Sequence, residues 1–432
     1  MRKWLNTSID NSGLILFRIL FGVLIMFESF GALLLGWVNT VFIQTKFTFH
    51  FIGFDFLELL HGIKMYYYFV AMGVLGLLIA LGFFYRWVII AFTILWTLVY
   101  FAQKEFYNNH YYFVVLIAFI MCFLPANKRW SLDVHFFPKI STTQVPRWMP
   151  FLLIFQVGIL YFYASLAKIY PDWLNGTFAS ILLSGYSASS FWLELINQKW
   201  FVLAYSYLGL FYDLFIIPAL LWKRTRIFAI LASLFFHLSN ALFLKIGIFP
   251  FFALSFIVLF LDYQNMNYSL FKTNEVRKMA LTNSFTNLYK LIFIPFFIFQ
   301  LLLPIRHFFI KGNVLFTEEG HRLSWRMMLS ERRGKLRIKV LNKQTKEMFY
   351  HNILADLNAK QINIVSHSPD MIWQYCQKIK EQYIFPIEIY VESFVSVNRR
   401  PYYRLIDQKV NMAEAKFDYF FHNEWILLQE LN

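Results

Sequence analysis

Cysteine and charged residues are both scarce in this sequence. Its 432 residues include two cysteines, and Asp, Glu, Lys and Arg together make up 15% of the chain. Cys122 lies in an apolar run and Cys376 lies near the carboxyl end, so we do not expect a disulfide between them. No group of Cys and His has the spacing of a zinc site, and we predict no metal ion.

Long runs of basic residues are also lacking. The net charge is +15, but no run of Lys and Arg is long enough for a dedicated nucleic-acid patch. We assign the excess positive charge to the loops of a membrane protein and to a basic exposed domain. We therefore predict no nucleic-acid partner.

Apolar residues are abundant instead. Hydrophobic residues make up 59% of the chain and aromatic residues 21%, whereas soluble proteins are nearer about 45–50% apolar. A helix needs roughly twenty apolar residues to cross a bilayer. The segment 40–61 is rich in Phe but broken by Gly53, and we predict that it is re-entrant or interfacial. Nine other segments have about the required length, at 14–37, 66–82, 87–102, 110–125, 150–168, 203–222, 226–244, 247–262 and 289–305.

Basic residues predict the orientation of these spans. Positively charged loops remain on the cytoplasmic side of a membrane. If the amino terminus is cytoplasmic, all the basic clusters fall on that side and the chain after Arg306 lies outside. That space is the periplasm if the protein lies in a bacterial inner membrane, which we expect, and the lumen if it lies in a eukaryotic membrane. The apolar run after the amino terminus is too long for a signal peptide, so we expect an uncleaved first span. The clusters are Arg2 and Lys3; Arg86; Lys128 and Arg129; Lys223, Arg224 and Arg226; and Lys272, Arg277 and Lys278.

The composition changes near residue 307. Segments 314–316, 336–341 and 387–391 have strand-like content or alternation, and 370–380 has helical spacing. We therefore predict a mostly α-helical transmembrane bundle of about nine spans at 1–306. A β-rich α/β domain outside the membrane follows at 307–432.

Lys168 ends one of the predicted spans. An ionisable group at the edge of hydrocarbon is by default a candidate functional residue. Burial disfavours the charged form of an amine, so a buried lysine can act as a general base. The alternative is a lysine that extends along the helix and places its ammonium in water.

The predicted topology brings further polar residues to the same outer face. Asn109, His110, Lys168, His237 and Asn240 are each expected near it, and they would form one pocket. Three of them have a simpler explanation: His110 could lie at the water interface, His237 could bond a backbone carbonyl, and Asn109 could cap a helix.

Four passages resemble the vitamin K-dependent γ-glutamyl carboxylases and their bacterial relatives with a horizontally transferred transmembrane (HTTM) domain. They are Asn-Asn-His-Tyr-Tyr at 108–112, Ala-Lys-Ile-Tyr-Pro-Asp-Trp-Leu-Asn-Gly at 167–176, the His237 passage at 236–249, and Thr-Glu-Glu-Gly-His-Arg-Leu-Ser-Trp-Arg-Met-Met-Leu at 317–329. The segment 398–407 fits the family's later soluble part. The resemblance covers nearly the whole chain.

The resemblance implies a reaction. In this family a lysine deprotonates a reduced vitamin K hydroquinone, oxygen adds, and a strongly basic alkoxide forms as the epoxide develops. That base removes a γ-proton from a peptidyl glutamate, and carbon dioxide captures the carbanion. Lys168 matches the base and His110 the assisting histidine. Asn109, His237 and Asn240 would hold the cofactor, which is phylloquinol or menaquinol.

The resemblance also places a glutamate-binding region. It implies that His321, Trp325, Arg332 and Arg400 hold a glutamate-containing protein or peptide, and an arginine fork suits a carboxylate. The alternative is that Trp325 belongs to a domain core and that the arginines are solvated surface.

Some features depart from the family. Ala167 stands where many carboxylases have a second lysine, and the sequence lacks much of the carboxyl-terminal extension of the longer members. A quinol epoxidase without efficient glutamate carboxylation is therefore an alternative. A membrane transporter or lipid-binding scaffold is another. The sequence does not indicate the oligomeric state.

Overall fold

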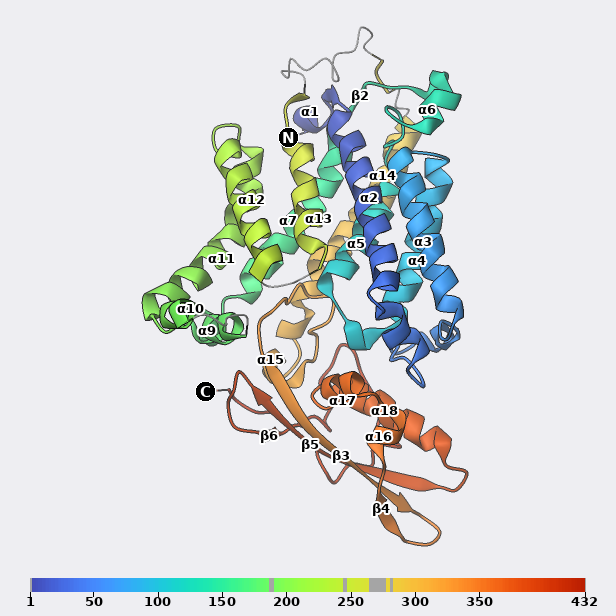
Figure 1. Cartoon of the computed structure of the whole chain (residues 1–432), viewed down its shortest axis with the longest axis vertical. Coiled ribbons are helices and arrows are strands. Elements are labelled where there is room, and N and C mark those ends of the chain that lie inside the picture. Colours follow the sequence, from blue (N-terminus) through green and yellow to red (C-terminus); the bar gives the residue numbers. More distant parts are fainter. Residues whose placement is uncertain (1, 186–189, 244–246, 264–276, 280–282, 432) are drawn as a thin grey trace.

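The computed structural model describes residues 2–185, 190–243, 247–263, 277–279 and 283–431. It consists of a helical bundle with a small sheet domain at one end (Figure 1). This confirms the predicted fold class. The carboxyl-terminal domain lies at the lower end of the view, and the amino terminus lies near the other end.

Seven helices are long and apolar enough to cross a membrane among the described residues. Together with two shorter apolar helices, they occupy all nine predicted segments. The long helices are α2 (Ser12–Leu34), α3 (Lys64–Leu81), α4 (Tyr85–Ala102), α7 (Trp148–Ala167), α11 (Lys199–Leu221), α12 (Arg226–Phe243) and α14 (Asn283–Leu302).

The two shorter helices are buried inside the bundle. Helix α5 (Asn109–Met121) has 13 residues, so it is about 20 Å long, against a hydrocarbon core of about 30 Å. α13 (Phe249–Ser255) continues into the 3-10 turn η5 (Phe256–Phe260). Neighbouring helices cover both, which is why they need not match the bilayer thickness themselves.

Helices α2 and α3 pack closely because glycines remove side chains from their contact. A Cβ atom on Gly22 would lie 2.4 Å from the backbone nitrogen of Ala80, and one on Gly76 would lie 2.7 Å from that of Met26. Small residues allow this approach in membrane bundles, where van der Waals packing drives helix association.

The basic clusters that the structure describes gather at the end of the bundle that lies away from the sheet domain. Lys272 of the last cluster lies outside the described residues. Strand β1 (Ser8–Asp10) pairs with β2 (Gln144–Pro146) at this end of the bundle, next to the short helices α1 (Arg2–Leu5) and α6 (Leu132–Phe136) (Figure 1). The structure thus agrees with one-sided positive charge. The cytoplasmic assignment of this end and the bacterial inner membrane remain predictions.

The carboxyl-terminal domain is a four-stranded antiparallel sheet in the order β4-β3-β5-β6. Its long central pair places Arg332 opposite Val397 and Val340 opposite Ile389. The apolar face of the sheet and Tyr375 and Ile379 of helix α18 share one core. The elements are β3 (Arg332–Asn342), β4 (Met348–Tyr350), α16 (Ile353–Asp356), α17 (Ala359–Val365), α18 (Pro369–Gln382), β5 (Ile387–Val397) and β6 (Tyr403–Arg404).

One predicted strand is wrong. Residues 314–316 lie in the short helix α15 (Val314–Thr317) and not in a strand. The side chain of Asn313 accepts a hydrogen bond from the backbone N–H of Leu315 at 2.9 Å and so caps the helix. This cap outweighs the strand preference of three apolar residues.

The segment 40–61 forms no long helix. It contains the π-helical turn η1 (Asn39–Ile43) and the 3-10 turn η2 (Asp55–Leu59). Phe49 is buried in the core of the carboxyl-terminal domain, and Gln374 donates to the carbonyl of His50 at 3.1 Å. The segment therefore joins the bundle to the sheet domain.

A charged cluster also joins the two parts. Lys104 Nζ lies 2.9 Å from a carboxylate oxygen of Asp370, and Arg322 Nε lies 3.1 Å from the same oxygen. Burial raises the pKa of the neighbouring Glu105 to about 7, although Phe49 N–H and Gln361 donate to its carboxylate. These groups lie outside the spans, at the base of the sheet domain.

Candidate active site

A cavity of about 640 Å³ lies between the bundle and the carboxyl-terminal domain. One wall is the start of α5, and another is α13. A third wall is formed by α15, by the loop that leads from it to the start of β3, and by His367. Its polar lining residues are Asn108, Asn109, His110, Glu318, His321, Arg326, Ser330, Arg332 and His367.

Asn108 and Asn109 position the start of α5. Asn108 is the helix cap, because its side chain accepts from the N–H of His110 at 2.7 Å. Asn109, for which a capping role was considered, instead accepts from the hydroxyl of Tyr107 at 2.8 Å and donates to the carbonyl of Arg326 at 3.2 Å. Asn109 therefore holds the loop that contains Arg326 against α5.

His110 has spare hydrogen-bonding capacity in this cavity. Its ring stacks on Phe249 with centroids 3.7 Å apart. Its Nδ1 is buried and has no hydrogen-bond partner among the described residues. Buried polar atoms are nearly always satisfied, so an orphaned one at a cavity wall indicates a place for a ligand group.

The ring of His237 also contacts Phe249, with centroids 6.1 Å apart. The hydroxyl of Tyr161 lies 2.8 Å from its Nε2, so its partner is a side chain and not the backbone carbonyl that was considered. Its Nδ1 has no partner among the described residues. Neither His237 nor Asn240, three residues further along α12, lines the 640 Å³ cavity.

Lys168 lies at the end of α7 that faces the sheet domain. Its ammonium forms an ion pair with Asp213 of α11, and it lies 5.3 Å from the centre of the Trp173 ring. The side chains of Lys168 and Asp213 are 13% and 6% exposed, so Lys168 does not extend into bulk water. Asp213 was not predicted, although an acid within an apolar span commonly pairs with a buried base.

The Lys168 site adjoins the cavity without lining it. Leu329 lines the cavity and also belongs to the buried cluster that contains Ala167 and Trp173. The hydroxyl of Tyr170 donates to the carbonyl of Leu329. One segment of chain thus separates Lys168 from the space beside His110.

Asp172, four residues after Lys168, does not pair with that lysine. It accepts two hydrogen bonds from Arg400, at 2.6 and 2.8 Å, and one from Asn398 at 2.6 Å. These donors lower the pKa of Asp172, with Arg400 as the largest cause. Arg400 therefore anchors the sheet domain beside the Lys168 segment and does not line the cavity.

Arg332 lines the cavity but is largely engaged by its surroundings. Its guanidinium donates to the carbonyl of Leu315, to that of Phe316 at 3.1 Å and to that of His367 at 2.6 Å. It also lies 3.3 Å from a carboxylate oxygen of Glu318. These contacts organise the cavity wall.

His321 and Arg326 also line the cavity. Burial lowers the pKa of His321 to about 4, so its ring is neutral near pH 7. Burial lowers the pKa of Arg326 to about 10. The Nε of Arg326 has no hydrogen-bond partner among the described residues, while its Nη1 lies 3.3 Å from His307. Arg326 was not predicted, although it directly follows Trp325 in a quoted passage.

Trp325 lies behind the cavity. It is fully buried, and its ring packs 5.1 Å from that of Tyr112 and 6.1 Å from that of Phe113. It belongs to the core of the helical bundle, although it follows the last span in sequence. Trp325 thus supports the position of Arg326.

An apolar cavity of about 640 Å³ adjoins this site. Tyr111, Gly247 and Ile248 line both cavities. The second one is lined mainly by apolar and aromatic side chains of α2, α3 and α4. The part of the chain that the structure describes contains no group of three His, Cys, Asp or Glu residues that could hold a metal ion.

Two family models match this chain. Residues 6–264 match the HTTM domain, and residues 285–432 match the lumenal domain of vitamin K-dependent gamma-carboxylase. The chain belongs to the vitamin K-dependent gamma-carboxylase family. No solved structure matches it.

Membership confirms the resemblance and gives the broad function. The protein is a multi-pass membrane protein of a carboxylating family, which uses reduced vitamin K and acts on glutamate-containing proteins. The lumenal match begins at residue 285, inside helix α14, and so includes most of that helix. The division of the chain at residue 306 and the roles of the individual site residues remain predictions.

Proposed function

We propose that this protein oxygenates reduced vitamin K to its epoxide and couples that reaction to carboxylation of peptidyl glutamate. The observation that carries the proposal is the buried Lys168–Asp213 pair beside a cavity with an orphaned histidine nitrogen. When bound, the vitamin K hydroquinone, with oxygen and carbon dioxide, supplies the strong base and the carboxyl group.

The chain's residues fit this cofactor. The free Nδ1 of His110 can bond a ring hydroxyl, and Phe249 offers an aromatic face beside it. The adjoining apolar cavity suits an isoprenoid tail, since its wall is mainly aliphatic and aromatic. Both features lie at the end of the bundle that faces the sheet domain.

Lys168 is the proposed base, and Asp213 is its proposed positioning residue. Two opposite charges buried together are costly, so a proton can move from the ammonium to the carboxylate and leave both groups neutral. The neutral amine can then accept a proton from a hydroxyl group. For this, the segment around Leu329 must let the hydroxyl group reach Lys168.

Arg326 is the proposed partner of the substrate carboxylate. Its Nε has no hydrogen-bond partner among the described residues. Arg332 instead donates to backbone carbonyls and has its Nε 3.3 Å from the carboxylate of Glu318. Arg400 is bound by Asp172. A charge-assisted bond to a glutamate side chain would satisfy the Nε of Arg326.

The engagement of Arg332 and Arg400 favours a second candidate, a quinol epoxidase without efficient carboxylation. Both arginines were predicted to hold glutamate, and both are committed to contacts within the protein. This candidate shares Lys168 and His110 with the first. It differs in that the strong base formed from the cofactor does not go on to deprotonate a glutamate efficiently.

One experiment separates these functions. Purified full-length protein would receive reduced vitamin K, oxygen, labelled bicarbonate and a Glu-containing peptide, with epoxide and fixed label measured together. Both products support the first proposal, and epoxide alone supports the second. Neither product, with cofactor binding demonstrated, would refute both.

A further inference from the structure

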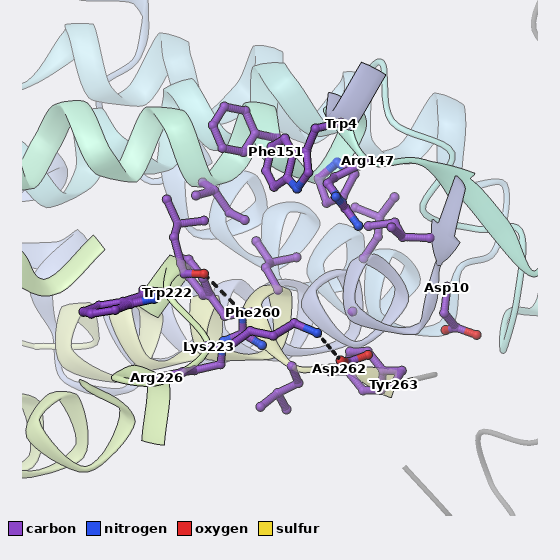
Figure 2. Close-up of a pocket in the computed structure, with 18 of the residues that line it drawn as sticks. Trp4, Asp10, Arg147, Phe151, Trp222, Lys223, Arg226, Phe260, Asp262 and Tyr263 are labelled. Atoms are coloured by element: carbon purple, nitrogen blue, oxygen red, sulfur yellow. Dashed lines mark hydrogen bonds and ion pairs between the residues drawn. The ribbon is translucent and has the colours of Figure 1, made fainter. Parts of the chain in front are cut away.

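A second polar cavity lies at the opposite end of the bundle. Its volume is about 620 Å³, and it is formed by α1, β1, the start of α7, the turn between α11 and α12, and the end of η5 (Figure 2). It contains none of the residues assigned above to cofactor or substrate. Its four basic side chains are Arg147, Lys223, Arg224 and Arg226, and its two acidic ones are Asp10 and Asp262.

The two acidic groups already have partners. Lys223 Nζ lies 3.3 Å from a carboxylate oxygen of Asp262, as the dashed line in Figure 2 shows. Asp10 accepts from the N–H of Ser12 at 2.7 Å and lies 3.5 Å from Arg129. The negative charge of the cavity is therefore largely balanced before any ligand binds.

Two arginines keep their hydrogen-bond donors available. The guanidinium of Arg147 lies over the ring of Trp4, 4.6 Å from its centre. This contact uses the face of the guanidinium and leaves its N–H groups at the edge. Arg224 is exposed on the turn after α11. No hydrogen bond or ion pair joins either side chain to another described residue.

The rest of the cavity is apolar. Leu14, Ile154 and Phe260 are buried in its wall. Trp4 and Trp222 line it as well and are 45% and 59% exposed. Exposed tryptophans at the ends of apolar helices are typical of the membrane–water interface. The cavity thus combines positive donors with a lipid-compatible wall at the depth of lipid headgroups.

We propose that this cavity binds the headgroup of an anionic phospholipid. Arg147 and Arg224 would donate to its phosphate, and an acyl chain would lie along the apolar wall. Basic pockets between membrane helices recognise acidic lipids in this way. A zwitterionic lipid brings no net negative charge to the two free guanidinium groups, so it would bind more weakly.

The test uses the full-length protein in detergent and fluorescent phosphatidylglycerol as the probe. We expect saturable binding. Arg147→Gln and Arg224→Gln should each weaken the affinity about five-fold, because one positive charge near the membrane surface contributes roughly that factor to the affinity for an anionic lipid. The matched control is Lys139→Gln, which removes an exposed positive charge from the same end outside the cavity and should leave affinity unchanged. Arg224→Gln changes an exposed side chain, so it tests the site even if Arg147→Gln fails to fold.

Three results would overturn the proposal. Phosphatidylcholine with the same acyl chains could bind as tightly as phosphatidylglycerol. Lys139→Gln could weaken binding as much as Arg224→Gln, which would indicate a diffuse surface effect. Finally, inorganic phosphate at low millimolar concentration could displace the lipid completely, which would indicate a site for a soluble anion.

Discussion

At the scale of single residues, the site depends on groups that are buried together. Lys168 contacts Asp213, and His110 stacks on Phe249 with a free Nδ1. Burying the charges of Lys168 and Asp213 costs free energy, and so does burying a ring nitrogen without a hydrogen-bond partner. Each feature therefore points to chemistry or to a ligand.

Lys168→Ala should abolish both epoxide formation and carboxylation. A general base contributes about 10²–10⁴-fold to the rate, so both activities should fall by at least about a hundredfold. The control is Lys199→Ala, which removes an exposed lysine at the start of α11. Retention of full activity by Lys168→Ala would refute the proposed mechanism.

Asp213→Asn tests the positioning role. We expect both activities to fall by about tenfold or more, because Lys168 loses its charge partner, while Asp213→Glu should recover part of the loss. Cofactor affinity, measured separately by binding, should change little in either variant. If the Asn and Glu variants are equally impaired, the carboxylate has no specific role.

Arg326→Gln tests the substrate contact. Loss of a charge-assisted hydrogen bond should raise the KM for a Glu-containing peptide by about 10–100-fold and leave epoxide formation in place. Arg333→Gln is the control, since Arg333 is exposed and pairs with Glu331 outside the cavity. Equal loss of both activities in Arg326→Gln would point to a collapsed cavity wall and not to substrate binding.

At the scale of elements, the bundle depends on close helix contacts. Helices α2 and α3 meet through Gly22 and Gly76, where an added Cβ would come within 3 Å of backbone atoms. The neighbour at each point is backbone and cannot rotate away. Their separation is therefore determined by the glycines.

Gly22→Leu should destabilise the bundle. The new side chain would force α2 and α3 apart, and overpacking of this kind costs about 1–3 kcal/mol or more. We expect a lower apparent Tm in detergent, and Gly31→Leu should have a smaller effect, because no atom lies within 4 Å of a Cβ at that position. Equal Tm values for the two variants would contradict the packing argument.

At the scale of the whole molecule, the charged cluster that joins the bundle to the sheet domain responds to pH. Burial alone would raise the pKa of Asp370, but the charges of Arg322 and Lys104 outweigh it and lower that pKa. Its stabilising contribution is therefore complete above its ordinary pKa of 3.8 and is lost as the pH falls through its folded value. Glu105 behaves in the opposite way.

Glu105→Gln should flatten the pH dependence of stability. Burial raises the pKa of Glu105 from 4.5 to about 7, so its contribution is present below pH 4.5 and is lost as the pH rises through about 7. By pH 8 the free energy of unfolding of the native protein should have fallen by about 3 kcal/mol through this group, a loss that the variant does not show. Apparent Tm values of both proteins at pH 5 and pH 8 provide the measurement, and parallel curves would contradict it.

Much of the architecture follows from the sequence alone. A run of about twenty apolar residues can satisfy its backbone in a bilayer only as a helix, so the nine segments were predictable from composition. The lysine at the end of one run was identifiable for the same reason, because a charge there is costly. The change of composition near residue 307 predicted the carboxyl-terminal domain, and the family passages supplied the expected chemistry.

Only the tertiary structure decided which distant residues meet. Asp213 pairs with Lys168, Asp172 binds Arg400, and Trp325 joins the bundle core. Span length and charge are properties of a local segment, whereas these partners depend on how helices rotate and pack against one another. The rotation of each helix results from many small contacts along the whole bundle. A short stretch of sequence therefore does not determine it.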